Sequence, residues 1–405
     1  MKFFFKTYGC TFNKSNSDII YPLIKDKLTD DISKADYVII NTCGVKEQTE
    51  KSIINEIKRI NKKIFLLGCL PYIRKDLLKI PELRGKDIEI FGLDLESFKK
   101  RLIEINGEIN ENVNRFLYTA PIARIPISTG CLMNCSYCAT KFVFGRLKSK
   151  SEREIIDLIK LAISSGALEI QLTGQDLGCY GFDIGTNLSS LLRKIAKLDG
   201  KFKVRVGMIN PAYLDAIPNE IFTESKFYHF LHLPVQSGSN DVLLDMKRTY
   251  KIEKIENFIE EKRREFDFTF ETDIIVGYPT EKEEDFFDTI KFIKETKPDV
   301  VNVTKFSKRP GTEASKLKEL NSKIVKKRSK EISDLVRKIS YEKNLSLVGK
   351  KFEVLIQEKG ENCMKGRNEC YKQVILKGDL KYDFYNCKVI SATVTSLIGE
   401  LEIGN

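Results

Sequence analysis

The sequence predicts an α/β protein with a small parallel-sheet domain, a central incomplete (β/α)6 TIM-like barrel and a small C-terminal β-barrel. Short apolar runs alternate with helical periodicity over most of the chain, which is typical of parallel sheets covered by helices. From residue 351 on, short strands are separated only by turn residues, which is typical of a small barrel. The length of 405 residues is enough for two or three domains.

Residues 1–115 form the first predicted domain. Its expected strands are residues 2–9, 36–43 and 62–69, and residues 50–60 carry the period of an amphipathic helix. Cys10, Cys43 and Cys69 each fall at the end of an expected strand. Because the carboxyl ends of parallel strands meet at one edge of a sheet, these three thiols can converge there.

A connector at 116–123 leads into the central domain, placed at 120–343. Its expected strands are residues 124–131, 168–174, 202–208, 227–235, 268–277 and 299–306, and helical periodicity fills the gaps, as at 151–166 and 283–296. Six β-α units of this size make an incomplete barrel, whose ligands bind at the carboxyl ends of the strands.

The C-terminal domain is placed at 344–405. Its expected strands are residues 351–357, 371–377, 385–396 and 399–404. Before it, residues 314–351 read as a helical stretch with 12 Lys and Arg against 4 Asp and Glu. Such a stretch could contact phosphates.

Composition narrows the class of protein. Apolar residues make up 42% and charged residues 31%, which excludes a disordered chain, a collagen-like repeat and a disulfide-stapled scaffold. The net charge of 68 − 57 = +11 fits a polyanionic partner without separating nucleic acid from a membrane surface. With no signal peptide and no apolar stretch of membrane-spanning length, we expect a cytoplasmic protein. Its ten cysteines then read as metal ligands or catalytic thiols before disulfides.

The strongest motif is Cys131-Leu-Met-Asn-Cys135-Ser-Tyr-Cys138. Three thiolates within eight residues suit three irons of a [4Fe–4S] cluster and leave the fourth iron open to a small molecule. A structural zinc site is the alternative, but it usually needs a fourth Cys or His at close spacing. The two histidines, His229 and His232, lie far downstream on another strand and read as hydrogen-bonded core residues.

This loop at the head of a β/α barrel resembles the signature of radical S-adenosylmethionine (radical SAM) enzymes. Further segments resemble motifs of the methylthiotransferases within that superfamily. They are YGC (8–10), NTCGV (41–45), GC (68–69), LTGQDLGCYG (172–181), HLPVQSGSNDVLLDMKRTY (232–250), TDIIVGYPTE (272–281) and KFSKRPGTEA (305–314). The segment GRNECYKQVIL (366–376) resembles the core of a TRAM domain, a small RNA-binding barrel.

The resemblance implies two [4Fe–4S] clusters, one on Cys131, Cys135 and Cys138 and an auxiliary one on Cys10, Cys43 and Cys69. The first reductively cleaves S-adenosylmethionine to a 5′-deoxyadenosyl radical, and sulfur is placed at the second. Overall a C–H bond becomes C–S–CH3. The S-adenosylmethionine pocket implied by the family consists of Tyr137, Thr173, Gly174, Gln175, Asp176, Gln236, Ser237 and Asp273. Ser237 and Asp273 could equally serve a turn and a strand end. No catalytic side chain is assigned.

The resemblance leaves the substrate between a tRNA adenosine beside the anticodon and an aspartate of a ribosomal protein. The segments 138–141, 144–149 and 278–281 resemble the archaeal and eukaryotic branch, which acts on N6-threonylcarbamoyladenosine in tRNA. The threonyl carboxylate of this nucleoside requires a cation in the binding pocket, and Lys141 and Arg146 are the candidates. A non-catalytic iron–sulfur RNA-binding protein remains the alternative from another class.

The predicted C-terminal barrel offers groups for RNA. Aromatic side chains for base stacking are Tyr371, Tyr382, Phe384 and Tyr385, and the cations are Lys365, Arg367, Lys372, Lys377, Lys381 and Lys388. Its charge is weak support, since residues 351–390 net only 8 − 6 = +2. Cys363 and Cys370 read as packing residues. The expected partners are tRNA, an electron donor such as ferredoxin or flavodoxin, and a sulfur donor, with the chain a monomer.

Overall fold

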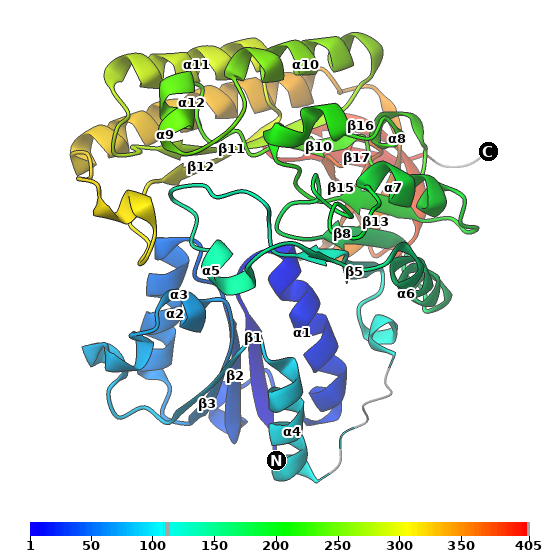
Figure 1. Cartoon of the computed structure of the whole chain (residues 1–405). Coiled ribbons are helices and arrows are strands. Elements are labelled where there is room, and N and C mark those ends of the chain that lie inside the picture. Colours follow the sequence, from blue (N-terminus) through cyan, green and yellow to red (C-terminus); the bar gives the residue numbers. More distant parts are fainter. Residues whose placement is uncertain (108, 110–113, 403–405) are drawn as a thin grey trace.

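Parallel strands alternate with helices at the start of the chain. The computed structural model describes residues 1–107, 109 and 114–402. Its first elements are β1 (Phe3–Thr7), α1 (Thr11–Ile24), β2 (Tyr37–Thr42), α2 (Glu47–Arg59), β3 (Lys63–Gly68), α3 (Leu70–Ile73), β4 (Ile88–Gly92) and α4 (Leu95–Asn106). The strands form one parallel sheet in the order β1-β2-β3-β4 (Figure 1).

Alternate residues of these strands face opposite layers of helix. Ile40 and Leu66 pack with Ile53 and Ile57 of α2, and the neighbouring residues of the same strands pack against α1 and α4 on the other face. Period-two alternation in strands that are buried on both sides explains the near-continuous apolar runs in the sequence. Strand β4 was not expected, because this partly exposed edge strand is short and carries Glu89 among its apolar residues.

The central part is the expected incomplete barrel. It contains β5 (Ile122–Pro126), β6 (Ser128–Thr129), α5 (Lys141–Phe144), β7 (Lys148–Ser149), α6 (Glu152–Ser164), β8 (Glu169–Thr173), α7 (Leu188–Ala196), β9 (Lys203–Val206), α8 (Glu220–Thr223), β10 (Phe230–His232), α9 (Asn240–Asp245), α10 (Ile252–Glu265), β11 (Thr269–Val276), α11 (Glu283–Thr296), β12 (Val300–Lys305) and α12 (Ser322–Leu345). Parallel sheets β5-β8-β9 and β10-β11-β12 meet at a bridge between Val204 and Phe227. Among the described strands, β5 and β12 do not pair, so the barrel is open between them.

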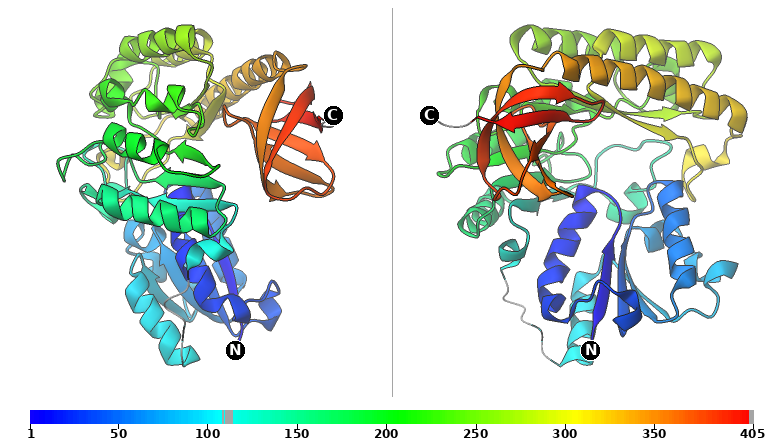
Figure 2. Two further views of the ribbon diagram at one scale, coloured as in Figure 1. Left: turned by 90° about the vertical axis from the view of Figure 1, so that its right-hand side faces the viewer. Right: turned by 180° about the vertical axis from the view of Figure 1, so that it is seen from behind.

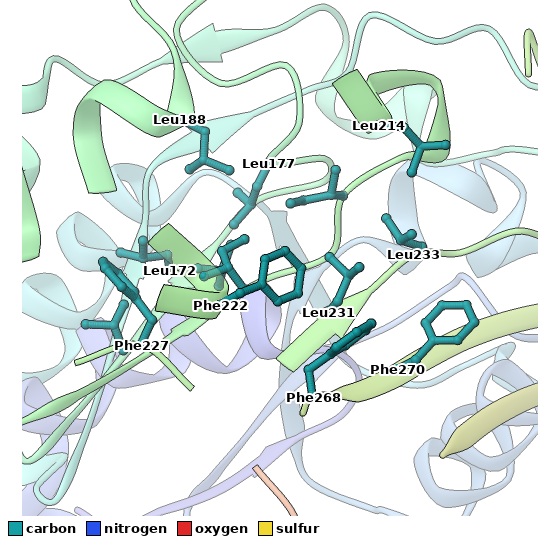
Figure 3. Close-up of a cluster of buried hydrophobic side chains, with 14 of the residues drawn as sticks. Leu172, Leu177, Leu188, Leu214, Phe222, Phe227, Leu231, Leu233, Phe268 and Phe270 are labelled. Carbon is teal, nitrogen blue, oxygen red and sulfur yellow. The ribbon is translucent and has the colours of Figure 1, made fainter. Parts of the chain in front are cut away.

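An apolar layer lies between the central strands and their helices. Figure 3 shows the leucine and phenylalanine side chains that fill it, including Leu172, Leu231, Phe222 and Phe270. The strand limits differ from those expected at two places. The connector already contains the start of β5 at Ile122, and the aromatic run at 227–235 pairs as β10 only over Phe230–His232.

The C-terminal strands close into a barrel of order β13-β14-β15-β17-β16. The strands are β13 (Lys351–Lys359), β14 (Cys363–Arg367), β15 (Gln373–Lys377), β16 (Phe384–Ala392) and β17 (Leu397–Leu401). Strand β14 was not expected, because its sequence CMKGR has little β-branched or aromatic character. The end of the strand expected at 399–404 lies outside the described residues, and the basic helix α12 is shorter than the stretch 314–351.

The turn between β14 and β15 joins this barrel to the amino ends of the central strands. The ring centroid of Tyr371 lies 4.8 Å from that of Tyr228 and 5.0 Å from that of Phe230. Lys372 Nζ lies 2.8 Å from Asp299 Oδ1, and the sulfur of Cys370 lies 3.6 Å from the carbonyl oxygen of Asp267. Figure 2 shows the barrel (orange and red) beside the central strands, at the end of α12.

These contacts correct part of the expectation for RNA binding. Tyr371 is packed into the protein and cannot stack on a base without leaving the central strands. Lys372 neutralises Asp299, and Lys365 pairs with Glu358 on the barrel itself. Tyr382 stays exposed, while Phe384 already lies under Lys201 Nζ, 4.4 Å from its ring centroid.

Candidate functional site

The Cys131, Cys135 and Cys138 loop stands at the carboxyl ends of β5 and β6, next to α5. The amide of Cys138 donates to the carbonyl of Cys135 at 3.2 Å, and the amide of Cys131 donates to the carbonyl of Gly145 at 3.4 Å. Gly130 enters the loop at φ +78°, and a Cβ there would lie 2.1 Å from the carbonyl oxygen of Arg146. Only glycine fits this close approach, so the turn before Cys131 depends on it.

A buried arginine supports the central cysteine of this loop. Arg248 is 6% exposed, and its Nη1 lies 3.6 Å from Cys135 Sγ. Burial raises the pKa of the Cys135 thiol, and the charge of Arg248 acts in the opposite direction. The cation therefore favours the thiolate, which is the form that binds metal.

Cys131 has two polar neighbours from the next strand-end loop. The neighbouring Cys179 thiol lowers the pKa of Cys131, and the amide of Met133, which donates to Cys131 Sγ at 3.3 Å, acts in the same direction. Asp176 Oδ2 lies 3.7 Å from Cys131 Sγ. Cys179 has no other cysteine at clustered spacing in the sequence, yet it lies beside the Cys131, Cys135 and Cys138 loop.

Cys10, Cys43 and Cys69 follow β1, β2 and β3 at one edge of the first sheet, as the strand pattern indicates. Cys10 and Cys69 also stand at the amino ends of α1 and α3. Burial raises the pKa of Cys43 and of Cys69, and the neighbouring thiols of the set raise them further. Gly9 has φ +101°, and a Cβ there would lie 2.6 Å from Cys43 Cβ and 3.0 Å from Cys43 Sγ, so there is no room for a side chain.

The two sets of cysteines lie close to each other across the boundary between the first sheet and the central barrel. Cys69 and Ile73 of the first part form one buried cluster with Ala139, Val143 and Phe144 of the second. Figure 1 shows α5 standing over α3 and the first sheet. The carboxyl edge of the parallel sheet therefore faces the carboxyl end of the barrel.

The donor sets fit iron–sulfur clusters better than single metal ions. In the described part of the chain, no three His, Cys, Asp or Glu side chains gather as they would around one ion. A zinc site with Zn–S bonds of about 2.3 Å would need sulfurs about 3.8 Å apart. In each set the thiols nevertheless influence one another electrostatically. Three cysteines in each set can bind three irons of a [4Fe–4S] cluster and leave the fourth iron open.

The predicted S-adenosylmethionine residues fall into two groups. Residues 173–176 adjoin the cysteine loop, because Gln175 Oε1 accepts from the amide of Gly130 at 2.7 Å and a Cβ on Gly174 would lie 2.9 Å from Ser128 Oγ. Thr173 Oγ1 is buried without a partner among the described residues. Tyr137 lies half-buried between Cys135 and Cys138, and burial raises its pKa.

Gln236, Ser237 and Asp273 lie on the other half of the barrel. Gln236 adopts φ +77° and bridges to Ile274 beside Asp273. Ser237 is buried at 1% exposure and accepts from the amide of Ser239 at 3.2 Å, so its hydroxyl serves the turn. Asp273 Oδ2 lies 2.8 Å from His232 Nε2, which makes His232 a hydrogen-bonded residue, as expected.

The two candidate substrate cations differ in their contacts. Lys141 Nζ lies 2.6 Å from Asn134 Oδ1 and 3.4 Å from the carbonyl oxygen of Cys135, so it braces the cysteine loop. Arg146 is exposed on the same loop.

A cavity of about 840 Å³ lies at the open side of the barrel, between β5, β12, α12 and the C-terminal barrel. Its lining includes Arg124, Gln171, Arg205 and Glu271. Arg205 lies over the rings of Phe230 and Tyr371, at 4.9 and 5.2 Å from their centroids, and its Nε is buried without a partner among the described residues. A polar cavity of this size can hold a nucleoside with a charged substituent.

The sequence pattern does not mark Arg248, Arg205 and Arg309 as site residues. Arg248 and Arg309 fall inside segments that resemble family motifs, but nothing in their local pattern marks a buried guanidinium. Their positions follow from tertiary packing alone.

Comparison with known proteins defines the class of the site. Residues 125–293 match the model of the radical SAM superfamily, and residues 2–85 match the uncharacterized protein family UPF0004. The solved structure of TsrM, a radical S-adenosylmethionine methyltransferase from Kitasatospora setae, shares the fold with TM-score 0.52 at 12% identity, covering 78% of this chain and 77% of that one. The protein therefore has a radical SAM domain.

Relatives over the whole length define the family. The chain is 40% identical to the "Probable threonylcarbamoyladenosine tRNA methylthiotransferase" of Archaeoglobus fulgidus and 38% identical to that of Pyrococcus abyssi. Each match covers 99% of this chain and 99% of the relative. The human threonylcarbamoyladenosine tRNA methylthiotransferase is 34% identical over 93% of this chain and 69% of its own length. The chain belongs to this family of methylthiotransferases, which confirms the resemblance to the archaeal and eukaryotic branch.

Proposed function

We propose that this protein is a tRNA methylthiotransferase that converts N6-threonylcarbamoyladenosine beside the anticodon to its 2-methylthio derivative. The observation that carries the proposal is the opposition of the two cysteine sets at the carboxyl end of the barrel. The family relationship supports the substrate, and the radical SAM domain supports the chemistry.

The proposed cofactors are S-adenosylmethionine and two [4Fe–4S] clusters. Cys131, Cys135 and Cys138 would hold one cluster, and Cys10, Cys43 and Cys69 would hold the other. When bound, these groups supply a carbon-centred radical and a site for sulfur, which no side chain can provide. The contacts of residues 173–176 with the cysteine loop support a role for them in the S-adenosylmethionine pocket.

The chain's own residues orient and shield this chemistry. Arg248 holds Cys135 and favours its thiolate, while Asp176 is fixed by the amides of Gly178 and Asn210, each at 3.0 Å from Oδ1. Cys69 and Ala139 belong to an apolar cluster that excludes water between the two cysteine sets. Exclusion of water protects a radical from side reactions.

The cavity supports a subsite for the threonyl carboxylate. Arg205 Nε is buried without a partner among the described residues and its guanidinium lies over the Phe230 and Tyr371 rings, a setting that strengthens a carboxylate contact. Arg205 is thus a third candidate for this contact, in addition to Lys141 and Arg146. It lines the cavity, whereas Lys141 already supports the cysteine loop.

We further propose three domains, at 1–115, 120–343 and 344–405, and a monomeric, cytoplasmic protein. The closed C-terminal barrel supports a TRAM-like RNA-binding domain. An electron donor such as ferredoxin or flavodoxin and a sulfur donor complete the proposed partners. Among the described residues, no helix is long and apolar enough to cross a membrane.

The test is a product analysis under anaerobic conditions. Reconstituted protein is incubated with S-adenosylmethionine, a reductant, sulfide and tRNA that carries N6-threonylcarbamoyladenosine, and the nucleosides are then separated and weighed by mass spectrometry. The expected product is the 2-methylthio nucleoside, with none from tRNA that lacks the threonylcarbamoyl group. Cleavage of S-adenosylmethionine without any methylthio product would contradict the proposal.

A further inference from the structure

Arg309 connects the central barrel to the first sheet. It lies in the loop after β12 and is 5% exposed. Its Nη1 lies 2.5 Å from Glu50 Oε2 on α2, and Arg74 of the first part takes the other carboxylate oxygen of Glu50. One N–H of the Arg309 guanidinium is therefore committed to a buried ion pair.

The remaining donors of Arg309 are not committed. Its Nε and Nη2 atoms are buried and have no hydrogen-bond partner among the described residues. An unpaired buried donor is costly, and native proteins rarely leave one without an acceptor. Two such donors on one buried cation point to an acceptor that the described residues do not provide.

The neighbours of the Arg309 loop show where such an acceptor would lie. Next in the loop, a Cβ on Gly311 would lie 3.4 Å from the ring of Phe142 on α5, and Pro310 lines a small cavity with Tyr72 and Ile73 of α3. The loop is thus held between the helices that follow Cys69 and Cys138. Gly44, which follows Cys43, packs against Leu70 and Ile73 of α3, and Ile73 lines the same small cavity as Pro310.

We propose that Arg309 donates its Nε and Nη2 hydrogens to an anionic sulfur ligand, a hydrosulfide or methanethiolate, held at the Cys10, Cys43 and Cys69 site. The inference rests on the proposed function, since it assumes that this site carries sulfur. A guanidinium presents two N–H groups side by side and suits a buried anion, because it loses less hydration than an ammonium. Arg309 is then a positioning residue that retains the sulfur while Glu50 fixes the guanidinium.

The experiment isolates the N-terminal site in the full chain. The parent is the Cys131→Ala, Cys135→Ala, Cys138→Ala variant, reconstituted anaerobically to about four irons. Methanethiolate is titrated into this parent and into its Arg309→Gln and Arg74→Gln derivatives, and binding is followed by the EPR spectrum of the reduced cluster. The midpoint potential of the cluster is measured on the same samples.

We expect Arg309→Gln to weaken methanethiolate binding at least about tenfold, because two charge-assisted hydrogen bonds are removed. The midpoint potential should become more negative, because a nearby positive charge is gone. Arg74→Gln is the matched control: it removes the other partner of Glu50 and should leave both quantities unchanged. Unchanged affinity in Arg309→Gln, or an equal loss in Arg74→Gln, would overturn the proposal.

A second variant covers the case in which Arg309→Gln binds fewer irons. Arg309→Lys keeps the charge but not the paired donors, and at full iron content it should weaken methanethiolate binding about threefold or more. Affinity equal to that of the parent would overturn the proposal. The product assay of the unmutated chain, run in parallel, separates this outcome from failure of the proposed function.

Discussion

Tyr371 of the C-terminal barrel packs its ring 5.0 Å from the ring of Phe230 at the start of β10. This contact places the C-terminal barrel at the amino ends of the central strands, opposite the end that carries the cysteines. The cavity at the open side of the central barrel lies between the central strands and the C-terminal barrel, and residues of both line it. A tRNA on the C-terminal barrel could therefore direct a nucleoside through this opening.

Tyr371→Ala should loosen this junction. Loss of this partly buried aromatic ring should cost about 2 kcal/mol, and the effect should appear as a lower thermal midpoint and as faster proteolysis near residues 345–351. Tyr382→Ala on the same barrel is the control, since Tyr382 is 47% exposed and should change neither. Equal proteolysis of the two variants would argue against a fixed junction.

Cys135→Ala should abolish cleavage of S-adenosylmethionine, because the reducing cluster loses an iron ligand. Cys43→Ala should retain cleavage and stop methylthio transfer. Both are measured as 5′-deoxyadenosine and methylthio nucleoside formed per protein. Loss of both products in Cys43→Ala would assign that residue to folding instead, and retention of both would remove the second cluster from the account.

Asp299 should make the stability of the protein depend on acid pH. Burial alone would raise its pKa, but the charges of Lys372 and Lys343 outweigh burial and hold it below the ordinary value of 3.8. Because the folded pKa is the lower one, the stabilisation is complete above pH 3.8 and is lost as the pH falls through the folded value.

Asp299→Asn should remove this acid dependence and lower stability at pH 7 by about 3 kcal/mol, since buried cations lose their partner. Chemical denaturation from pH 7 down to pH 3 measures both effects. Asp379→Asn, which breaks an exposed pair with Lys359, should follow the unmutated protein. A parallel pH profile for Asp299→Asn and the unmutated protein would contradict the assignment.

The exposed face of α12 should contribute to tRNA affinity. It presents lysines that form no ion pair in the described part of the chain, namely Lys323, Lys326, Lys327 and Lys330. Changing all of them to Gln should weaken tRNA binding. The slope of log K against log salt should also fall by about 0.7 to 0.9 for each phosphate that the variant no longer neutralises.

A control with the same charge change keeps this prediction specific. Its substitutions to Gln are at exposed cations of the helices around the first sheet, away from the cavity, namely Lys58, Arg59, Lys79 and Lys100. Binding measured across a salt series should stay close to that of the unmutated protein. If both variants lose affinity equally, only net charge matters and α12 does not bind the tRNA specifically.

The sequence was most informative where local pattern determines position. Cys10, Cys43 and Cys69 follow apolar strand runs, and a parallel sheet necessarily brings such positions to one edge. It was least informative where packing between distant segments determines the position of a side chain. Nothing local distinguishes Tyr371 as a buried contact from an aromatic free to stack on a base, and Glu50 and Arg309 lie 259 positions apart in sequence. Strands β4 and β14 were missed because edge position and barrel closure outweigh weak β-propensity.

The most direct test of two clusters in one enzyme is anaerobic iron and sulfide content with Mössbauer spectra. The intact chain is compared with the Cys131→Ala, Cys135→Ala, Cys138→Ala variant. Two clusters require about eight irons in the intact chain and about four in the variant, all in [4Fe–4S] clusters. About four irons in the intact chain and none in the variant would contradict it, because the thiols at the edge of the first sheet would then hold no sulfur-bearing site.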